Sequence, residues 1–193
     1  MVTVSSPSRR YSIADLDTFP DDGRLRELVD GQLVEWDGTT PRHGFLETVL
    51  VRELSLFARD HRFGKVSSGD ALVRILGSEY DARGADIAFF RRTNMPRDLD
   101  APATLTIPDL VVEILSPSDR ASRVLEKVND WLRTGVHLLW YINPETGATT
   151  VYHAGHVSHV AANEPLDGAD VLPGLVLRMS DLLGEIHEDD QTT

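Results

Sequence analysis

Two stretches of the sequence carry hydrophobic residues at helical spacing. In residues 43–62 the apolar positions recur every three or four residues, which predicts a long helix with one buried face. These positions are Leu46, Val49, Leu50, Leu54 and Phe57. A second helix is predicted over residues 119–134, with Ser118 as its N-cap and Gly135 as its end. A short amphipathic helix is predicted after Ser12, over residues 13–19.

Shorter hydrophobic runs predict strands between and after these helices. Residues 25–36 alternate around Asp30-Gly31 and predict an N-terminal hairpin, and residues 137–155 predict a C-terminal one. Further strands are predicted at residues 71–76, 85–90 and 109–115, and a last strand or short helix at residues 172–183. The runs 85–90 and 109–115 are apolar on both faces, which is typical of central strands. The order predicts an α/β or α+β fold with a central mixed β-sheet flanked by helices.

Length and composition favour one intracellular domain. A chain of 193 residues that is 41% hydrophobic suits a single domain, predicted over residues 11–186, with flexible tails at residues 1–10 and 187–193. Cysteine is absent, and we find neither a signal peptide nor an apolar run long enough for a membrane span, so we expect a cytoplasmic protein with no membrane partner. The net charge of −12 argues against non-specific binding of polyanions, although a bound divalent cation would reverse the charge locally.

Two of the predicted central strands carry a carboxylate among hydrophobic residues. Because side chains alternate along a strand, Glu113 shares a face with Asp109 and Leu115, and Asp86 shares a face with Phe90. Burying an ionised carboxylate is costly, so Glu113 and Asp86 each need a cation, a metal or a donor. On neighbouring strands they would form a site for Mg²⁺, as in metal-assisted phosphodiester hydrolysis. Alternatively, each pairs with an arginine or caps loop backbone, and the residue pattern favours neither interpretation.

Two further polar residues lie next to these strands. Asp109 follows Pro108 at the start of its strand, and we expect it to be an exposed strand-entry residue. Lys127 lies at the edge of the apolar face of the second long helix, which we predict from Val124, Leu125, Val128, Trp131 and Leu132. From that edge its ammonium group can reach a strand end, but the pattern alone favours a lysine that extends into solvent.

Six segments taken in order resemble one known family. They are RELVDGQLVEW, PRHGFLETVLVREL, ADIAFF, PDLVVEILSPSD, EKVNDWLRTGVHLLWYINP and LPGLVLRMSDLL. Together they resemble the Uma-two family of restriction-endonuclease-like proteins, which belongs to the PD-(D/E)XK nuclease superfamily. The resemblance covers roughly residues 11–183.

This resemblance implies a set of metal-binding and catalytic residues. In the superfamily, an aspartate on one strand and a glutamate on the next hold Mg²⁺, for which Mn²⁺ can substitute. Carried over, Asp86 and Glu113 are the metal ligands, and the main-chain carbonyl of Ile114 is a further ligand. Leu115 stands where the superfamily lysine usually follows, so the resemblance gives the role of positioning the attacking water to Lys127 on the next helix.

Other matched positions extend or weaken the resemblance. Glu27 matches an acidic residue of the family and is expected to bind metal directly or through water, with a catalytic role. His43 matches a histidine that opens the long helix of the family. A lone histidine is more often a cap or a polar contact than a catalyst. Ala85 replaces the proline common before the motif aspartate, and Arg123 replaces an acid one turn before the lysine. These departures indicate either drift or a decayed site.

The implied function is a Mg²⁺-dependent endonuclease that hydrolyses DNA phosphodiester bonds. Duplex DNA is the expected substrate, and a homodimer is expected because duplex cutters commonly place one site on each strand. Basic residues that could contact phosphates are Arg24, Arg26, Arg42, Arg74 and Arg91. Two alternatives stay open: a non-catalytic module of the same fold that acts as a nucleic-acid sensor or scaffold, or a hydrolase of another phosphoester such as RNA.

Overall fold

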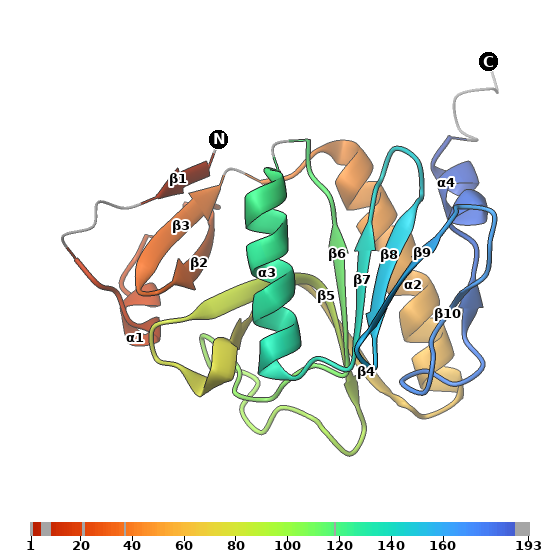
Figure 1. Ribbon diagram of the computed structural model, residues 1–193. Helices are drawn as coiled ribbons and strands as arrows, with labels where there is room; N and C mark the ends of the chain where they lie inside the picture. Colours follow the sequence, from red (N-terminus) through yellow and green to blue (C-terminus); the bar gives the residue numbers. More distant parts are fainter. Residues whose placement is uncertain (1, 5–8, 21, 37, 118, 188–193) are drawn as a thin grey trace.

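The computed structural model describes residues 2–4, 9–20, 22–36, 38–117 and 119–187 (Figure 1). Its helices are α1 (Ile13–Leu16), α2 (Pro41–Asp60), the 3₁₀ helix η1 (Ile75–Gly77), α3 (Ala121–Thr134) and α4 (Met179–His187). The strands are β1 (Val2–Val4), β2 (Leu25–Val29), β3 (Gln32–Trp36), β4 (Gly64–Arg74), β5 (Ala82–Arg91), β6 (Leu110–Ile114), β7 (Leu138–Ile142), β8 (Thr149–His153), β9 (His156–Val160), β10 (Leu166–Asp167) and β11 (Val176–Leu177).

The first nine strands form one mixed sheet, and β10 and β11 form a separate pair. The order in the large sheet is β1-β3-β2-β5-β6-β7-β8-β9, with β4 paired to β5. Strands β6 and β7 are parallel because the chain crosses over through α3 between them, whereas the other pairs in this sheet are antiparallel. The predicted mixed sheet with flanking helices is therefore confirmed.

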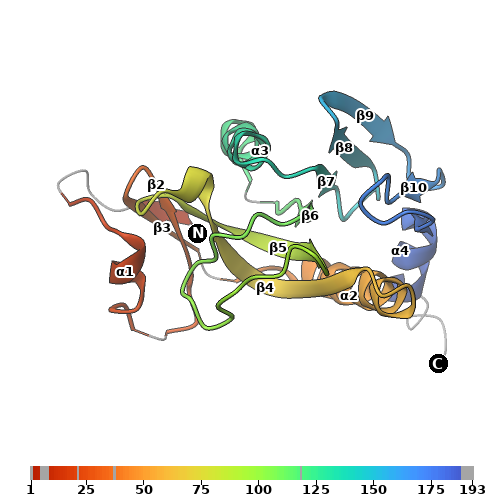
Figure 2. The ribbon, with the colours of Figure 1, turned by 90° about the horizontal axis from the view of Figure 1, so that it is seen from below.

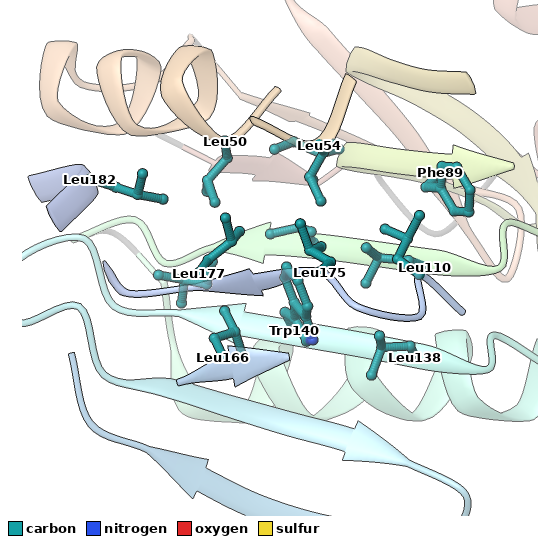
Figure 3. Close-up of a cluster of buried hydrophobic side chains, with 14 of the residues drawn as sticks. Leu50, Leu54, Phe89, Leu110, Leu138, Trp140, Leu166, Leu175, Leu177 and Leu182 are labelled. Carbon is teal, nitrogen blue, oxygen red and sulfur yellow. The ribbon is translucent and has the colours of Figure 1, made fainter. Parts of the chain in front are cut away.

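The helices cover opposite faces of the sheet, as the view from below shows (Figure 2). On one face, Leu46, Leu50 and Leu54 of α2 pack with side chains of β5, β6, β7 and α4 (Figure 3). On the other face, Val128 and Trp131 of α3 pack on a second buried cluster. Strand β6 contributes alternate residues to the two clusters, so it is central as its composition predicts.

One edge of β5 is shared by two strands, and this divided edge shapes the rest of the molecule. The opposite edge pairs with β4 from Ala82 to Arg91. On the divided edge, β2 pairs only at Ala82, and β6 pairs only with residues 87–89. Residues 83–86 lie between these two pairings. We call this opening, bounded by β2, residues 83–86 of β5 and β6, the fork.

Most predicted elements are confirmed. Both hairpins form, and Asp30 and Gly31 take φ of 50° and 75°, which suits a two-residue turn between twisted strands. The segment 172–183 contains both a short strand, β11, and the start of α4. The helix predicted to end at Gly135 does so, with Gly135 at a φ of 104°. Its predicted cap, Ser118, lies outside the described residues, and α3 begins after Arg120.

Two predictions about helix faces and tails differ from the structure. Leu125 is 59% exposed and Leu132 is 40% exposed, so neither belongs to the buried face of α3. Because α3 meets the sheet along a narrow stripe formed by Val124, Val128 and Trp131, the two leucines fall on its flanks. In the predicted N-terminal tail, Val2–Val4 pair with β3 as strand β1. At the other end α4 extends to His187, and residues 188–193 lie outside the described part.

Among the described residues, none of the helices is both long and apolar enough to cross a membrane.

Substitution of Gly135 by alanine tests how α3 ends. A side chain at positive φ costs about 1 kcal/mol, so G135A should lower the free energy of unfolding by that amount. Gly44 lies inside α2 in open space, and G44A should instead raise the stability by about 0.5–1 kcal/mol. Urea unfolding measures both, and an equal effect of the two substitutions would contradict this account.

Candidate active site

Carboxylates close the fork where backbone pairing stops. The Oδ2 atom of Asp86 accepts a hydrogen bond of 2.6 Å from the N–H of Ile114, beyond the last paired residue of β6. On the β2 side, Oε1 of Glu27 accepts a bond of 2.9 Å from the N–H of Gly84. Each side chain therefore satisfies a backbone donor that a neighbouring strand would otherwise satisfy. Both residues are buried, at 8% and 3% exposure.

Glu113 precedes Ile114 on β6 and points to the face covered by α3. Its Oε2 accepts a hydrogen bond of 2.9 Å from Nζ of Lys127, and its Oε1 accepts one of 2.8 Å from Nε1 of Trp131. The same ammonium lies 3.2 Å from Oε1 of Glu27. Lys127 therefore points inward and connects two of the predicted site residues, and its side chain is only 16% exposed.

A buried arginine links this cluster to α3 at a second point. Nη1 of Arg83 donates to Oε2 of Glu27 at 3.2 Å, while Nε and Nη2 donate to Oδ2 of Asp130 at 2.8 and 2.6 Å. Arg83, Asp130 and the indole of Trp131 were not among the site residues predicted from the sequence. The spacing of Asp130, three residues after Lys127, was the one available signal that both side chains lie on the same side of α3.

Two residues of α2 approach Asp86 from the opposite side of the sheet. Nε2 of His43 lies 3.3 Å from Oδ2 of Asp86, and the backbone N–H of His43 donates to the capping hydroxyl of Thr40. His43 is thus in polar contact with Asp86. Glu47, one turn later, accepts a bond of 3.4 Å from the N–H of Gly69. Burial raises the pKa of Glu47, and the charge of Asp86 raises it further.

The proximity of these charges shifts several pKa values. Burial raises the pKa of Glu113 to about 8, with Asp86 and Glu27 acting in the same direction and Lys127 opposing them. Burial on its own would lower the pKa of Lys127, but Glu113, Glu27 and Asp86 outweigh it and raise this pKa well above its ordinary value. Burial, followed by the charge of Glu113, raises the pKa of Tyr141 on the neighbouring strand.

The donor set can be compared with the needs of a divalent cation. Asp86, Glu113 and the carbonyl of Ile114 are oxygen donors from neighbouring strands, as Mg²⁺ prefers. However, both oxygens of Glu113 accept hydrogen bonds, and no group of three or more histidine or acidic side chains in the described part of the chain is arranged to hold a metal ion. The residues therefore fit a site with two carboxylates, completed by water and phosphate oxygens, better than a closed protein cage.

A cavity of about 270 Å³ adjoins the fork. Glu27 and Gly84 of the fork are among its lining residues, and so are Arg24 and Arg26. These two arginines belong to the set of predicted phosphate contacts. Like Arg74, which donates to the carbonyl of Ala103, and Arg91, which donates to Asp170, Arg26 is bonded within the protein, to Glu35 and Asp22.

Asp109 is not exposed, contrary to the sequence prediction. It is 4% exposed, and its Oδ2 accepts hydrogen bonds from the N–H of Arg91 at 2.9 Å and from Nδ2 of Asn94 at 3.0 Å. The carboxylate is buried because it caps the backbone at the end of β5, where the chain turns away. Asp109 therefore has a local structural role at the end of β6 opposite to Glu113.

Replacement of Glu113 by glutamine tests the charge balance of the cluster. Because folding raises the pKa of Glu113 from 4.5 to about 8, the folded chain retains a proton that the unfolded chain releases in this pH window. Ionisation of Glu113 therefore costs stability as the pH rises from about 5 to 8, and the unfolding free energy of the wild type should fall relative to that of E113Q. Urea unfolding at several pH values measures this, and a pH-independent difference between the two proteins would contradict it.

Comparisons with known proteins identify the family. The sequence matches the family Uma2, described as "Putative restriction endonuclease", over residues 13–180. None of the curated proteins matches the chain. Among solved structures, the fold is similar to "a putative nuclease belonging to DUF820 from Anabaena variabilis ATCC 29413", with a TM-score of 0.76 and 17% identity over 90% of this chain and 97% of that one. The family match covers most of the chain and agrees with the resemblance in its sequence, and we conclude that the chain belongs to the Uma2 family.

Proposed function

We propose that the protein is a Mg²⁺-dependent endonuclease that hydrolyses DNA phosphodiester bonds at the fork. The observation that carries this proposal is the bond between Lys127 and Glu113 beside Asp86. Two carboxylates from neighbouring strands and one ammonium group are the groups that metal-assisted phosphodiester hydrolysis needs. Membership of the Uma2 family, described as "Putative restriction endonuclease", supports the same reaction class.

Asp86, Glu113 and the carbonyl of Ile114 would hold the cation. When bound there, Mg²⁺, or Mn²⁺ in its place, would supply Lewis-acid chemistry for phosphodiester hydrolysis. For Glu113 to serve as a ligand, its Oε2 must lose the hydrogen bond that it accepts from the ammonium of Lys127. Because a nearby cation favours the ionised form of Glu113, the protein should release a proton when the cation binds.

Lys127 would act as a charged donor and not as a base. Its pKa lies well above the ordinary value, so the side chain remains an ammonium at neutral pH. In this state it can donate to the attacking water and offset negative charge that develops on the phosphate. Glu27 already accepts hydrogen bonds from Gly84 and Arg83 and forms an ion pair with Lys127, so within the proposal it acts on the reaction mainly by holding Lys127.

The expected substrate and assembly follow from the same proposal. A duplex has two strands to cut, and a homodimer with one site for each strand would cut both in one binding event. The cavity beside Glu27 would admit a segment of backbone, with Arg24 and Arg26 near its phosphates.

Supercoiled plasmid incubated with Mg²⁺ or Mn²⁺ tests the activity. The wild type should cleave it, and D86N and E113Q should each lose at least about 100-fold in rate because an essential charge is removed. D109N is the matched control, since Asp109 is a buried carboxylate on the same face of the same strand segment but outside the cluster, and it should retain activity.

The products of this assay also test the assembly and the substrate. Linear DNA formed without nicked intermediates is expected of a dimer, whereas accumulation of nicked circles would contradict paired cutting. A parallel RNA substrate tests the choice of nucleic acid, and faster cleavage of RNA would overturn the assignment to DNA. Equal cleavage by wild type and E113Q would exclude catalysis at the fork.

One observation favours a second candidate, a non-catalytic module of the same fold. Both oxygens of Glu113 are bonded within the protein, which is how a purely structural ion pair would look. Calorimetry with Mn²⁺ in two buffers of different ionisation enthalpy separates the candidates. The nuclease proposal predicts binding with proton release that E113Q abolishes, and the absence of carboxylate-dependent binding would favour the non-catalytic module.

A further inference from the structure

We propose that Arg83 is a positioning residue, which divides the Lys127 ammonium between Glu27 and Glu113. The inference rests on the proposed function, because it assigns Arg83 a part in the same reaction. Arg83 is 5% exposed and directs its guanidinium at Glu27 and Asp130. It would therefore influence the reaction through Lys127 and not by touching DNA.

The contacts form a closed circuit between β5, β2 and α3. Arg83 on β5 donates to Oε2 of Glu27 on β2, and Oε1 of the same carboxylate lies 3.2 Å from the Lys127 ammonium. The circuit returns to Arg83 through α3, because Asp130 lies about one turn after Lys127 and accepts two bonds from the guanidinium. In Figure 1, α3 accordingly lies in front of β5, between β2 and β6.

The ammonium of Lys127 is shared between Glu113 and Glu27. Lys127 is 2.9 Å from Glu113 and 3.2 Å from Glu27, so two carboxylates compete for one ammonium. Arg83 donates to Oε2 of Glu27 and offsets part of the negative charge of this carboxylate. Glu27 therefore attracts Lys127 less strongly. Without Arg83, Glu27 would be a buried anion whose nearest cation is Lys127, and the ammonium would move away from Glu113 toward Glu27.

An arginine suits this position better than a lysine. Its planar guanidinium presents several donors in fixed directions, so it can bond acids on two different elements at once. A lysine at the same place would keep the charge but bond only one of them well. The chain itself uses arginine for nearly all its basic residues, and Lys65 and Lys127 are its only two lysines.

The main test is R83Q, compared with R83K and with a control of similar instability. We expect kcat to fall at least tenfold in R83Q while KM for DNA stays within threefold, and R83K to recover part of kcat. Binding of Mn²⁺ should become tighter in R83Q, because Glu113 is released from Lys127. L54A removes buried side chain under α2, far from the fork, and should lose stability but keep kcat and Mn²⁺ affinity near those of the wild type.

A second readout is independent of cleavage. Lysine labelled with ¹⁵N gives one side-chain signal each for Lys65 and Lys127, so Lys65 serves as an internal control. R83Q should shift the Lys127 signal and leave that of Lys65 unchanged. If R83Q does not fold, R83K carries both measurements. An unchanged Lys127 signal in R83Q would overturn the proposal, and so would Mn²⁺ binding in R83Q that is no tighter than in the wild type. If the Lys127 signal shifts in R83Q as expected but the wild type never cleaves DNA, the result counts against the proposed nuclease function alone.

Discussion

The divided edge of β5 is the constraint on which the rest of the structure depends. A strand offers one row of backbone groups to each neighbour, and here two strands that diverge share a single row. The groups left between them must still be bonded, because a buried and unpaired amide is costly. Glu27 and Asp86 meet that need with carboxylates, which brings negative charge into the interior at the point where α3 crosses the sheet.

Because carboxylates occupy the fork, cationic side chains must lie beside them to balance the buried charge. Glu27, Asp86 and Glu113 together are too many anions for a buried volume unless cations accompany them. Lys127 and Arg83 provide two positive charges, and they approach from a helix and a strand, so the balance also fixes α3 against the sheet. The arrangement leaves Glu113 with a raised pKa, which marks it as the group that a further cation would affect most.

The sequence predicted the helices, the hairpins and the central strands because burial imposes a clear period on each of them. It also indicated which neighbours share a face with Asp86 and with Glu113 on their own strands, since alternation along a strand is local. It could not predict that Asp109 is buried, because the donors that enclose it come from Arg91 and Asn94, beyond a turn. Arg83 and Asp130 were missed for the same reason: their partnership spans 47 residues of sequence and exists only after α3 has packed on the fork.

The bond from Asp86 to Ile114 has a consequence for how relatives of this chain should be compared. This carboxylate completes the sheet as well as contributing to the charge cluster. A descendant that had lost all chemistry would still be under pressure to retain an acid here, simply to keep two strands joined. Under the nuclease proposal, the identity of residue 86 therefore discriminates poorly between active and inactive members. Lys127, which serves no backbone group in these contacts, is the more informative position for that purpose.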